Sequence, residues 1–208
     1  MLNYASFGAP GMSVSSAVIH ITRGETAVIL PNKIFLTKGV GVHKEKLSSF
    51  EVALRNAGVA PFNLVRVSSI YPPNCKMLSR EAGLKYLSPG QILFTVIAEA
   101  ATNEPNRLIA SSIGMAFPKN PDQYGYLSEA HTYGWTEKKT ADYAEDLAAE
   151  MLATTLGVKF DPEASYDKKR AQWKISKEIV KTRALTQSAE GHKDGLWTTV
   201  LAMAVMIH

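Results

Sequence analysis

The feature that most constrains this fold is a series of apolar runs rich in valine, isoleucine and threonine, separated by short turn signals. β-branched residues favour strands, whereas clusters of glycine, proline and asparagine favour turns. Gly39-Val40-Gly41 and Pro118-Lys119-Asn120 are two of the expected turns. The predicted strands are residues 18–22, 34–38, 62–68, 91–100, 108–117 and 124–133, with two more within 172–184 and 196–207.

Two segments follow the helical period instead. Residues 44–57 place apolar side chains on one face, and Gly58 follows as a stop signal. Thr136 is a suitable N-cap for a second helix that ends before Gly157. The apolar faces are expected to be formed by Leu47, Phe50, Ala53, Leu54 and Ala57 in the first helix, and by Tyr143, Leu147, Met151 and Leu152 in the second.

The order of these elements predicts the fold class. Several strands separate the two helices, which argues against alternating βαβ units. An α+β protein fits best, with a largely antiparallel sheet or with two stacked sheets flanked by helices. The 208 residues are 46% hydrophobic and 20% charged, which excludes a disordered chain. No linker is long enough to separate domains, so we expect one domain over residues 1–208, with 161–170 as an exposed excursion.

Charge and cysteine content exclude several classes of protein. A formal net charge of +4 does not by itself demand a nucleic-acid partner. The single cysteine, Cys75, excludes an internal disulfide and a cysteine-based zinc site. The first twenty residues do not read as a signal peptide, and the apolar run 196–207 is shorter than the ~20 residues that a membrane-spanning helix needs. We expect a soluble, cytoplasmic protein that binds no membrane.

Three patterns associated with ligand binding are incomplete. Gly39-Val40-Gly41 precedes a predicted helix, as a dinucleotide-binding loop does, but Lys44 stands where the third glycine is needed. The five histidines show no ligand spacing, so no metal site is expected. Residues 168–183 carry seven basic side chains, which suit either a nucleic-acid-binding arm or the solvated face of a strand near a sheet edge. The second interpretation is preferred, and no nucleic acid is expected.

Residues 62–73 carry a more specific signal, an alternating strand that ends in Ser68-Ser69 and Pro72-Pro73. Paired serines after a strand are usually just a strand end. A serine hydroxyl held against the preceding carbonyl can also attack it and convert the amide to an ester. Elimination of that ester leaves dehydroalanine, which hydrolyses to a pyruvoyl group at a new N-terminus. This chemistry requires a strained turn and a donor for the developing oxyanion, and Asn63 could be that donor if the fold brings it back to the turn.

The segment Asn63-Leu-Val-Arg-Val-Ser68-Ser69-Ile with Pro72-Pro73 resembles the self-cleavage segment of pyruvoyl-dependent arginine decarboxylases. The likeness covers most of residues 31–160 and an alanine-rich last strand. Other matching positions are Pro31-Asn32, Phe50, Ala53, Leu54, Asn56-Ala57-Gly58, Ile113-Gly114, Pro118-Lys119, Gly125 and Glu129.

The resemblance implies a fold and an assembly. The family fold is a four-layer α-β-β-α sandwich with largely antiparallel sheets, and it assembles as a homotrimer, or a multiple of one, with active sites between neighbouring subunits. By similarity, cleavage falls between Ser68 and Ser69. Residues 1–68 would form a β chain, and residues 69–208 an α chain whose first residue is a pyruvoyl group made from Ser69.

The resemblance also implies residue roles. Glu129 matches the catalytic glutamate that donates a proton, and Asn63 matches an asparagine that supports cleavage and binding. Ser68, freed as a carboxylate terminus, would line the site. Glu51 aligns with an aspartate that meets the substrate guanidinium, and a carboxylate suits that planar fork. Glutamate is one methylene longer, however, and side-chain length affects where a terminal cation sits.

The expected activity is self-processing followed by decarboxylation of L-arginine to agmatine and carbon dioxide through a Schiff base. The covalent pyruvoyl group would replace pyridoxal phosphate as the electron sink, without a metal. Two alternatives stay open. One is a pyruvoyl-dependent decarboxylase of another amino acid, and the other is an uncleaved, non-catalytic trimeric binding homologue. No role is assigned to the additional residues at the N-terminus or at 159–183.

Overall fold

The computed structural model describes residues 29–157 and 179–208. The predicted strand 18–22 and the expected excursion 161–170 lie outside these residues, as does most of the basic stretch. In chain order the described elements are β1 (Lys33–His43), α1 (Lys46–Ala57), β2 (Asn63–Arg66), β3 (Ile70–Tyr71), β4 (Lys76–Leu78), α2 (Arg80–Leu84), β5 (Ile92–Thr102), β6 (Leu108–Pro118), β7 (Gly125–Tyr133), α3 (Glu137–Thr155), β8 (Ile179–Glu190) and β9 (Trp197–Ile207).

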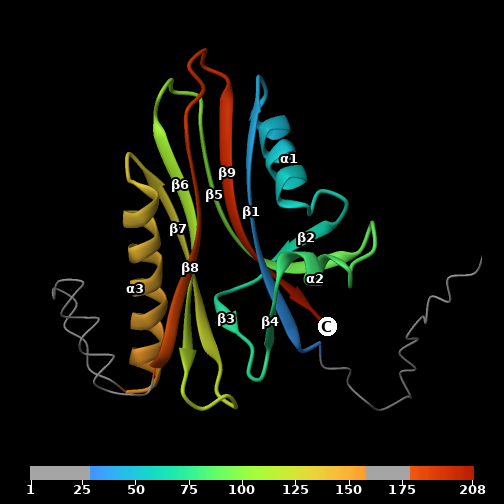
Figure 1. Ribbon diagram of the computed structural model, residues 1–208, viewed down its shortest axis with the longest axis vertical. Coiled ribbons are helices and arrows are strands. Elements are labelled where there is room, and N and C mark those ends of the chain that lie inside the picture. The colour runs from blue at the N-terminus through green and yellow to red at the C-terminus, as the bar shows by residue number, and fades with distance from the viewer. Residues whose placement is uncertain (1–28, 158–178) are drawn as a thin grey trace, which may run out of the picture.

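The strands form two stacked sheets. The first sheet has the order β2-β5-β9-β1-β4 and the second the order β3-β7-β6-β8. β4 pairs with β1 and β2 with β5 in parallel, whereas the other described pairs are antiparallel. Helix α3 covers the outer face of the second sheet and α1 that of the first, which makes four layers (Figure 1). The predicted α+β sandwich with largely antiparallel sheets is confirmed.

Strand β9 is the centre of the first sheet and is buried on both faces. Ala202, Ala204 and Met206 face the core between the sheets. The alternating residues, including Leu201 and Met203, face the layer of α1 and α2. Burial on both faces explains why this segment reads as an unbroken apolar run in the sequence. Within the described residues, no helix is long and apolar enough to cross a membrane.

The predicted turn at Gly39-Val40-Gly41 is wrong, because these residues lie inside β1. A Cβ atom on Gly39 would be 2.1 Å from the carbonyl oxygen of Ala53, and one on Gly41 would be 2.0 Å from that of Ser49. Both carbonyls belong to α1, so the glycines allow the helix backbone to lie directly on the strand. The glycine pair therefore serves helix packing and not a phosphate-binding loop.

Both predicted helices exist, but their expected apolar faces are only partly correct. Leu47 of α1 is 79% exposed, and Tyr143 of α3 is 44% exposed. The face that α3 buries consists mostly of alanines, because small side chains let the helix backbone approach the second sheet. A Cβ on Gly114 of β6 would be 2.0 Å from the Ala144 carbonyl oxygen. The buried residues of α3 are Thr140, Ala144, Ala148, Ala149, Leu152 and Ala153.

The described end of the basic stretch lies on β8, at the edge of the second sheet. Lys181 and Arg183 are both exposed there. Lysine on an exposed edge strand discourages unwanted pairing with other chains. These two residues therefore fit the preferred interpretation, the solvated face of an edge strand.

Candidate active site

Residues 67–69 carry the chain from the first sheet to the second, between β2 and β3 (Figure 1). Before the crossing, the backbone N–H of Val67 donates to the carbonyl oxygen of Thr95 on β5, at 3.0 Å. After it, the N–H of Leu127 on β7 donates to the carbonyl oxygen of Ser69, at 2.7 Å. The Ser68–Ser69 peptide bond is thus held between one anchor on each sheet.

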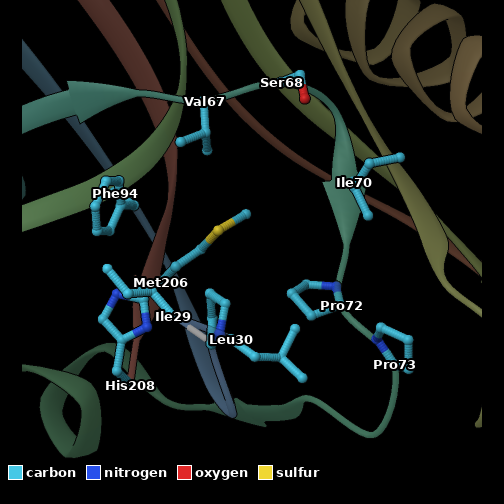
Figure 2. A pocket seen from close by; sticks show the side chains of 11 residues that line it. Ile29, Leu30, Val67, Ser68, Ile70, Pro72, Pro73, Phe94, Met206 and His208 are labelled. Carbon is cyan, nitrogen blue, oxygen red and sulfur yellow. The ribbon is translucent and has the colours of Figure 1, made fainter. Parts of the chain in front are cut away.

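A tight turn is centred on Ser69. The backbone N–H of Ile70 donates to the carbonyl oxygen of Ser68, with 3.1 Å between nitrogen and oxygen. Figure 2 shows Ser68 at the bend between Val67 and Ile70. The turn needs no left-handed residue at Ser69, because the described non-glycine residues with positive φ are Asn74 and Asn106.

Glu129 lies close to this turn on the neighbouring strand. Ile70 pairs with Tyr126 in the β3–β7 ladder, and the Leu127 hydrogen bond extends the pairing to Ser69. Leu127 points into the core between the sheets. Glu129 follows two residues later on β7 and lies on the same face, about 7 Å further along the strand. The structure therefore places Glu129 on the strand next to the serine pair, two residues along β7 from the contact with Ser69.

A histidine that sequence reasoning missed lies beside Glu129. The Nε2 atom of His131 is 3.9 Å from Glu129 Oε2, and the two side chains are 42% and 30% exposed, respectively. His131 Nδ1 lies 3.0 Å from the backbone nitrogen of Glu99 and 2.9 Å from its carbonyl oxygen, so β5 fixes the ring in either tautomer. The spacing Glu129-Ala130-His131 is the signal that could have found it, because alternate residues of a strand share a face.

An ion pair lies near the turn, at the part of the β5 edge beyond the pairing with β2. Arg66, the last residue of β2, donates from Nη2 to Glu99 Oε2 at 2.9 Å. Its other terminal nitrogen lies 3.4 Å from the carbonyl oxygen of Ile97. Arg66 thus closes part of an edge that no described strand covers beyond the β2 pairing.

Asn63 is not brought back to the turn within this chain. It begins β2, and its side-chain amide donates to the carbonyl oxygen of Gly90 at 2.9 Å. Five residues of extended chain separate it from Ser68, which corresponds to about 16 Å. The role given to Asn63 by resemblance stays a prediction, and within this chain its amide is bonded to Gly90 instead of lying at Ser68.

Glu51 also lies apart from the serines. It is on α1, where its Oε1 atom accepts a hydrogen bond from Arg55 Nε at 2.6 Å, and its side chain is 42% exposed. Helix α1 covers the outer face of the first sheet (Figure 1). Glu129 instead shares a face of β7 with Leu127, which points into the core between the sheets. A single chain therefore does not place Glu51 against Ser69.

A pocket of about 360 Å³ opens beside the crossing. Its lining is almost entirely apolar and includes Val67, Ile70, Phe94 and Met206 together with Pro72-Pro73, while Ser68 is at its rim (Figure 2). The paired prolines therefore shape the wall of this pocket. None of the described residues that line it has a carboxylate side chain, so this lining suits methylene groups better than a cation.

Tyr71 anchors the chain just after the turn. Its ring is buried and packs edge-on against Phe117, with 4.9 Å between ring centroids. Its hydroxyl donates to the carbonyl oxygen of Cys75 at 2.6 Å. Burial raises the pKa of Tyr71, and burial likewise raises the pKa of the Cys75 thiol, to about 11. Both groups are uncharged at neutral pH, as a buried anchor requires.

Comparison with known proteins gives one family. A family model described as pyruvoyl-dependent arginine decarboxylase matches residues 33–208. A probable pyruvoyl-dependent arginine decarboxylase of Chloroherpeton thalassium is 60% identical over 178 residues, which cover 86% of this chain and 98% of that protein. Proteins named pyruvoyl-dependent arginine decarboxylase in Nitrosopumilus maritimus and pyruvoyl-dependent arginine decarboxylase 2 in Methanosarcina mazei are 54% and 52% identical, each with 86% of this chain and 98% of its own length covered.

Proposed function

The chain belongs to the pyruvoyl-dependent arginine decarboxylase family, and from that premise we propose that it cleaves itself between Ser68 and Ser69 and then converts L-arginine to agmatine and carbon dioxide. The observation that carries this proposal is the peptide bond between the two sheets. Hydrogen bonds anchor it on both sides, and Glu129 lies on the adjacent strand.

Self-cleavage uses only groups of the chain and one water molecule. The hydroxyl oxygen of Ser69 adds to the carbonyl carbon of Ser68, and the C–N bond breaks, so that the amide becomes an ester. Loss of the α-proton of Ser69 then breaks the bond between its Cβ and the ester oxygen, which leaves a carboxylate on Ser68. The dehydroalanine that remains takes up water and releases ammonia to give the pyruvoyl group.

The surroundings of Ser69 fit this group. It would form in place of the serine side chain and nitrogen, where the carbonyl oxygen of residue 69 is already held by Leu127. Once formed, it supplies an electron sink for loss of the substrate carboxylate. Glu129 holds the proton that replaces the carboxylate at the α-carbon of arginine, and a positioned side chain of this kind is a typical general acid.

We infer that the carboxylate that meets the substrate guanidinium comes from outside this chain's own site. The apolar pocket beside Ser68 can cover methylene groups, but its described lining residues include no acidic partner for a guanidinium. Glu51 lies on the outer face of α1, and a carboxylate there can meet the site of a neighbouring subunit. We therefore place each active site between two subunits of a trimer, with Glu51 contributed by the neighbour.

One alternative, a pyruvoyl-dependent decarboxylase of another amino acid, is favoured by the longer side chain of Glu51, because side-chain length affects where a terminal cation sits. To distinguish arginine from another substrate, purified protein is incubated with a panel of cationic and neutral amino acids, and the amines that form are quantified. Agmatine as the dominant product supports the proposal, whereas another amine would replace arginine as the substrate.

Self-cleavage is tested by intact mass. Wild type should give two fragments that end at Ser68 and begin at residue 69, and the larger should lack a free amino terminus. Ser69→Ala should remain one chain, because no hydroxyl remains to attack. If the wild-type chain stays whole, the proposal is wrong and the second alternative, an uncleaved, non-catalytic binding homologue, is the interpretation that remains.

A further inference from the structure

Self-cleavage places negative charge on one identified atom. When the Ser69 hydroxyl adds to the carbonyl carbon of Ser68, the carbonyl oxygen of Ser68 becomes an oxyanion. A preorganised donor aimed at such an atom is often the largest single contribution to the rate. Asn63 does not supply it within this chain, because its amide is bound to Gly90 at the far end of β2.

We propose that the backbone N–H of Ile70 is the oxyanion donor for self-cleavage, an inference that rests on the proposed function. This N–H already donates to the carbonyl oxygen of Ser68 at 3.1 Å. A hydrogen bond to an oxygen that gains charge becomes shorter and stronger, whereas the same bond to a neutral carbonyl contributes little. The interaction therefore stabilises the transition state more than the ground state.

The donor is available because of where β3 lies in the sheet. β3 is the edge strand of the second sheet, and its ladder contact near the turn runs from the Leu127 N–H to the Ser69 oxygen. In an antiparallel pair, neighbouring residues alternate between facing the partner strand and facing away. The N–H of Ile70 points away from β7 and is bonded to Ser68 instead.

The neighbouring contacts hold this N–H in place. On one side, the Ser69 oxygen is fixed by Leu127, and Val67 is fixed by Thr95 on the opposite sheet. On the other side, Tyr71 is 8% exposed and bonds to the Cys75 oxygen through its hydroxyl. A donor fixed on both sides needs no rearrangement when charge develops.

Proline at position 70 removes this donor and leaves the bond from Leu127 to Ser69 and the bond from Val67 to Thr95 in place. An edge-strand N–H that faces away from its partner strand can be removed without breaking a hydrogen bond of the ladder. A proline at this position also favours extended backbone in the residue before it. We expect Ile70→Pro to cleave about 10²- to 10³-fold more slowly than Ile70→Val, the usual cost of losing one oxyanion donor. Ile70→Val keeps the N–H and a β-branched side chain, and it is the matched comparison. The measurement is the fraction of cleaved chain against time after synthesis, followed by denaturing gel and intact mass.

The controls separate this inference from the proposed function. A wild-type chain that never cleaves overturns both, whereas equal cleavage rates in Ile70→Pro and Ile70→Val overturn only the role of the N–H. Folding is checked in the uncleavable background by comparing the thermal unfolding of Ser69→Ala with that of Ser69→Ala/Ile70→Pro. If the proline variant does not fold, the test is instead the rate of hydrogen exchange at the Ile70 amide in full-length Ser69→Ala. A protected Ile70 N–H supports the donor, and exchange at the unprotected rate overturns it.

Discussion

Replacement of Glu129 by glutamine separates the two reactions that we propose. The change keeps the size of the side chain and removes its acidic proton. Because the Ser68–Ser69 turn is held by backbone hydrogen bonds from Ile70, Leu127 and Val67, the variant should still cleave itself. Turnover of arginine should fall about 10²- to 10⁴-fold, the usual contribution of a general acid.

The surroundings of Glu129 show why so large a loss would report proton delivery. The Nε2 atom of its neighbour His131 is 3.9 Å from Glu129 Oε2, and both side chains are partly exposed. A pair of this kind contributes at most ~1 kcal/mol, so losing it can account for a roughly fivefold effect. A loss of two orders of magnitude must therefore come from the proton that glutamine cannot donate.

Glu99→Gln is the matched control for this experiment. Glu99 is 27% exposed and bonds to Arg66. It meets the His131 ring through its backbone, and its side chain points to the outer face of the first sheet. We expect Glu99→Gln to change turnover by less than about fivefold, the ceiling for an exposed pair. Intact mass gives the extent of cleavage and agmatine formation gives kcat and KM. Turnover of Glu129→Gln within the range of Glu99→Gln would remove Glu129 from proton transfer.

Three further outcomes are expected. Glu51→Ala should leave cleavage intact and lower kcat/KM for arginine roughly 10- to 100-fold, the usual effect of losing a hydrogen bond to a charged group. An unchanged kcat/KM would refute the contact between Glu51 and the guanidinium. The free energy of unfolding should fall as the pH rises from about 9 towards about 11, because the folded chain keeps the Cys75 proton that the unfolded chain loses. In denaturant titrations, Cys75→Ala should make this fall less steep. Gly39→Ala should lower the free energy of unfolding by about 1–3 kcal/mol in the same assay, because its Cβ would overlap the Ala53 carbonyl of α1, and equal stability would refute that close packing.

The long strands could be predicted from the sequence because each carries its own periodic signal. The predicted segments 91–100, 108–117 and 196–207 agree with β5, β6 and β9 to within two residues at every end. β3, β4 and α2 were missed, since elements of two to five residues are too short to show a period. The turn assigned to Gly39-Val40-Gly41 failed for another reason. Glycine signals either a turn or close packing, and only the position of α1 distinguishes them.

Some parts of the candidate site could also be predicted from the sequence, whereas others could not. The serine pair and Glu129 could be named from the sequence, and their proximity depends on the pairing of β3 with β7. The N–H of Ile70 could not be found by any residue pattern, because every residue except proline has one and only the fold aims it. Glu51 shows a further limit, since the role that we propose for it in a neighbouring subunit cannot be seen in the geometry of its own chain.

The position of the proposed cleavage bond would allow the protein to break its backbone and keep its fold. Cutting between Ser68 and Ser69 assigns β1, α1 and β2 to one fragment and the other described elements to the second. The first sheet then contains strands of both fragments, because β1 lies between β9 and β4, and β2 pairs with β5. The β1–β9 ladder alone joins eleven residue pairs, from Lys33–Ile207 to His43–Trp197. Separating the fragments would require unfolding that sheet, so we expect the two ends of a cut at this bond to stay where the hydrogen bonds of Thr95 and Leu127 hold them.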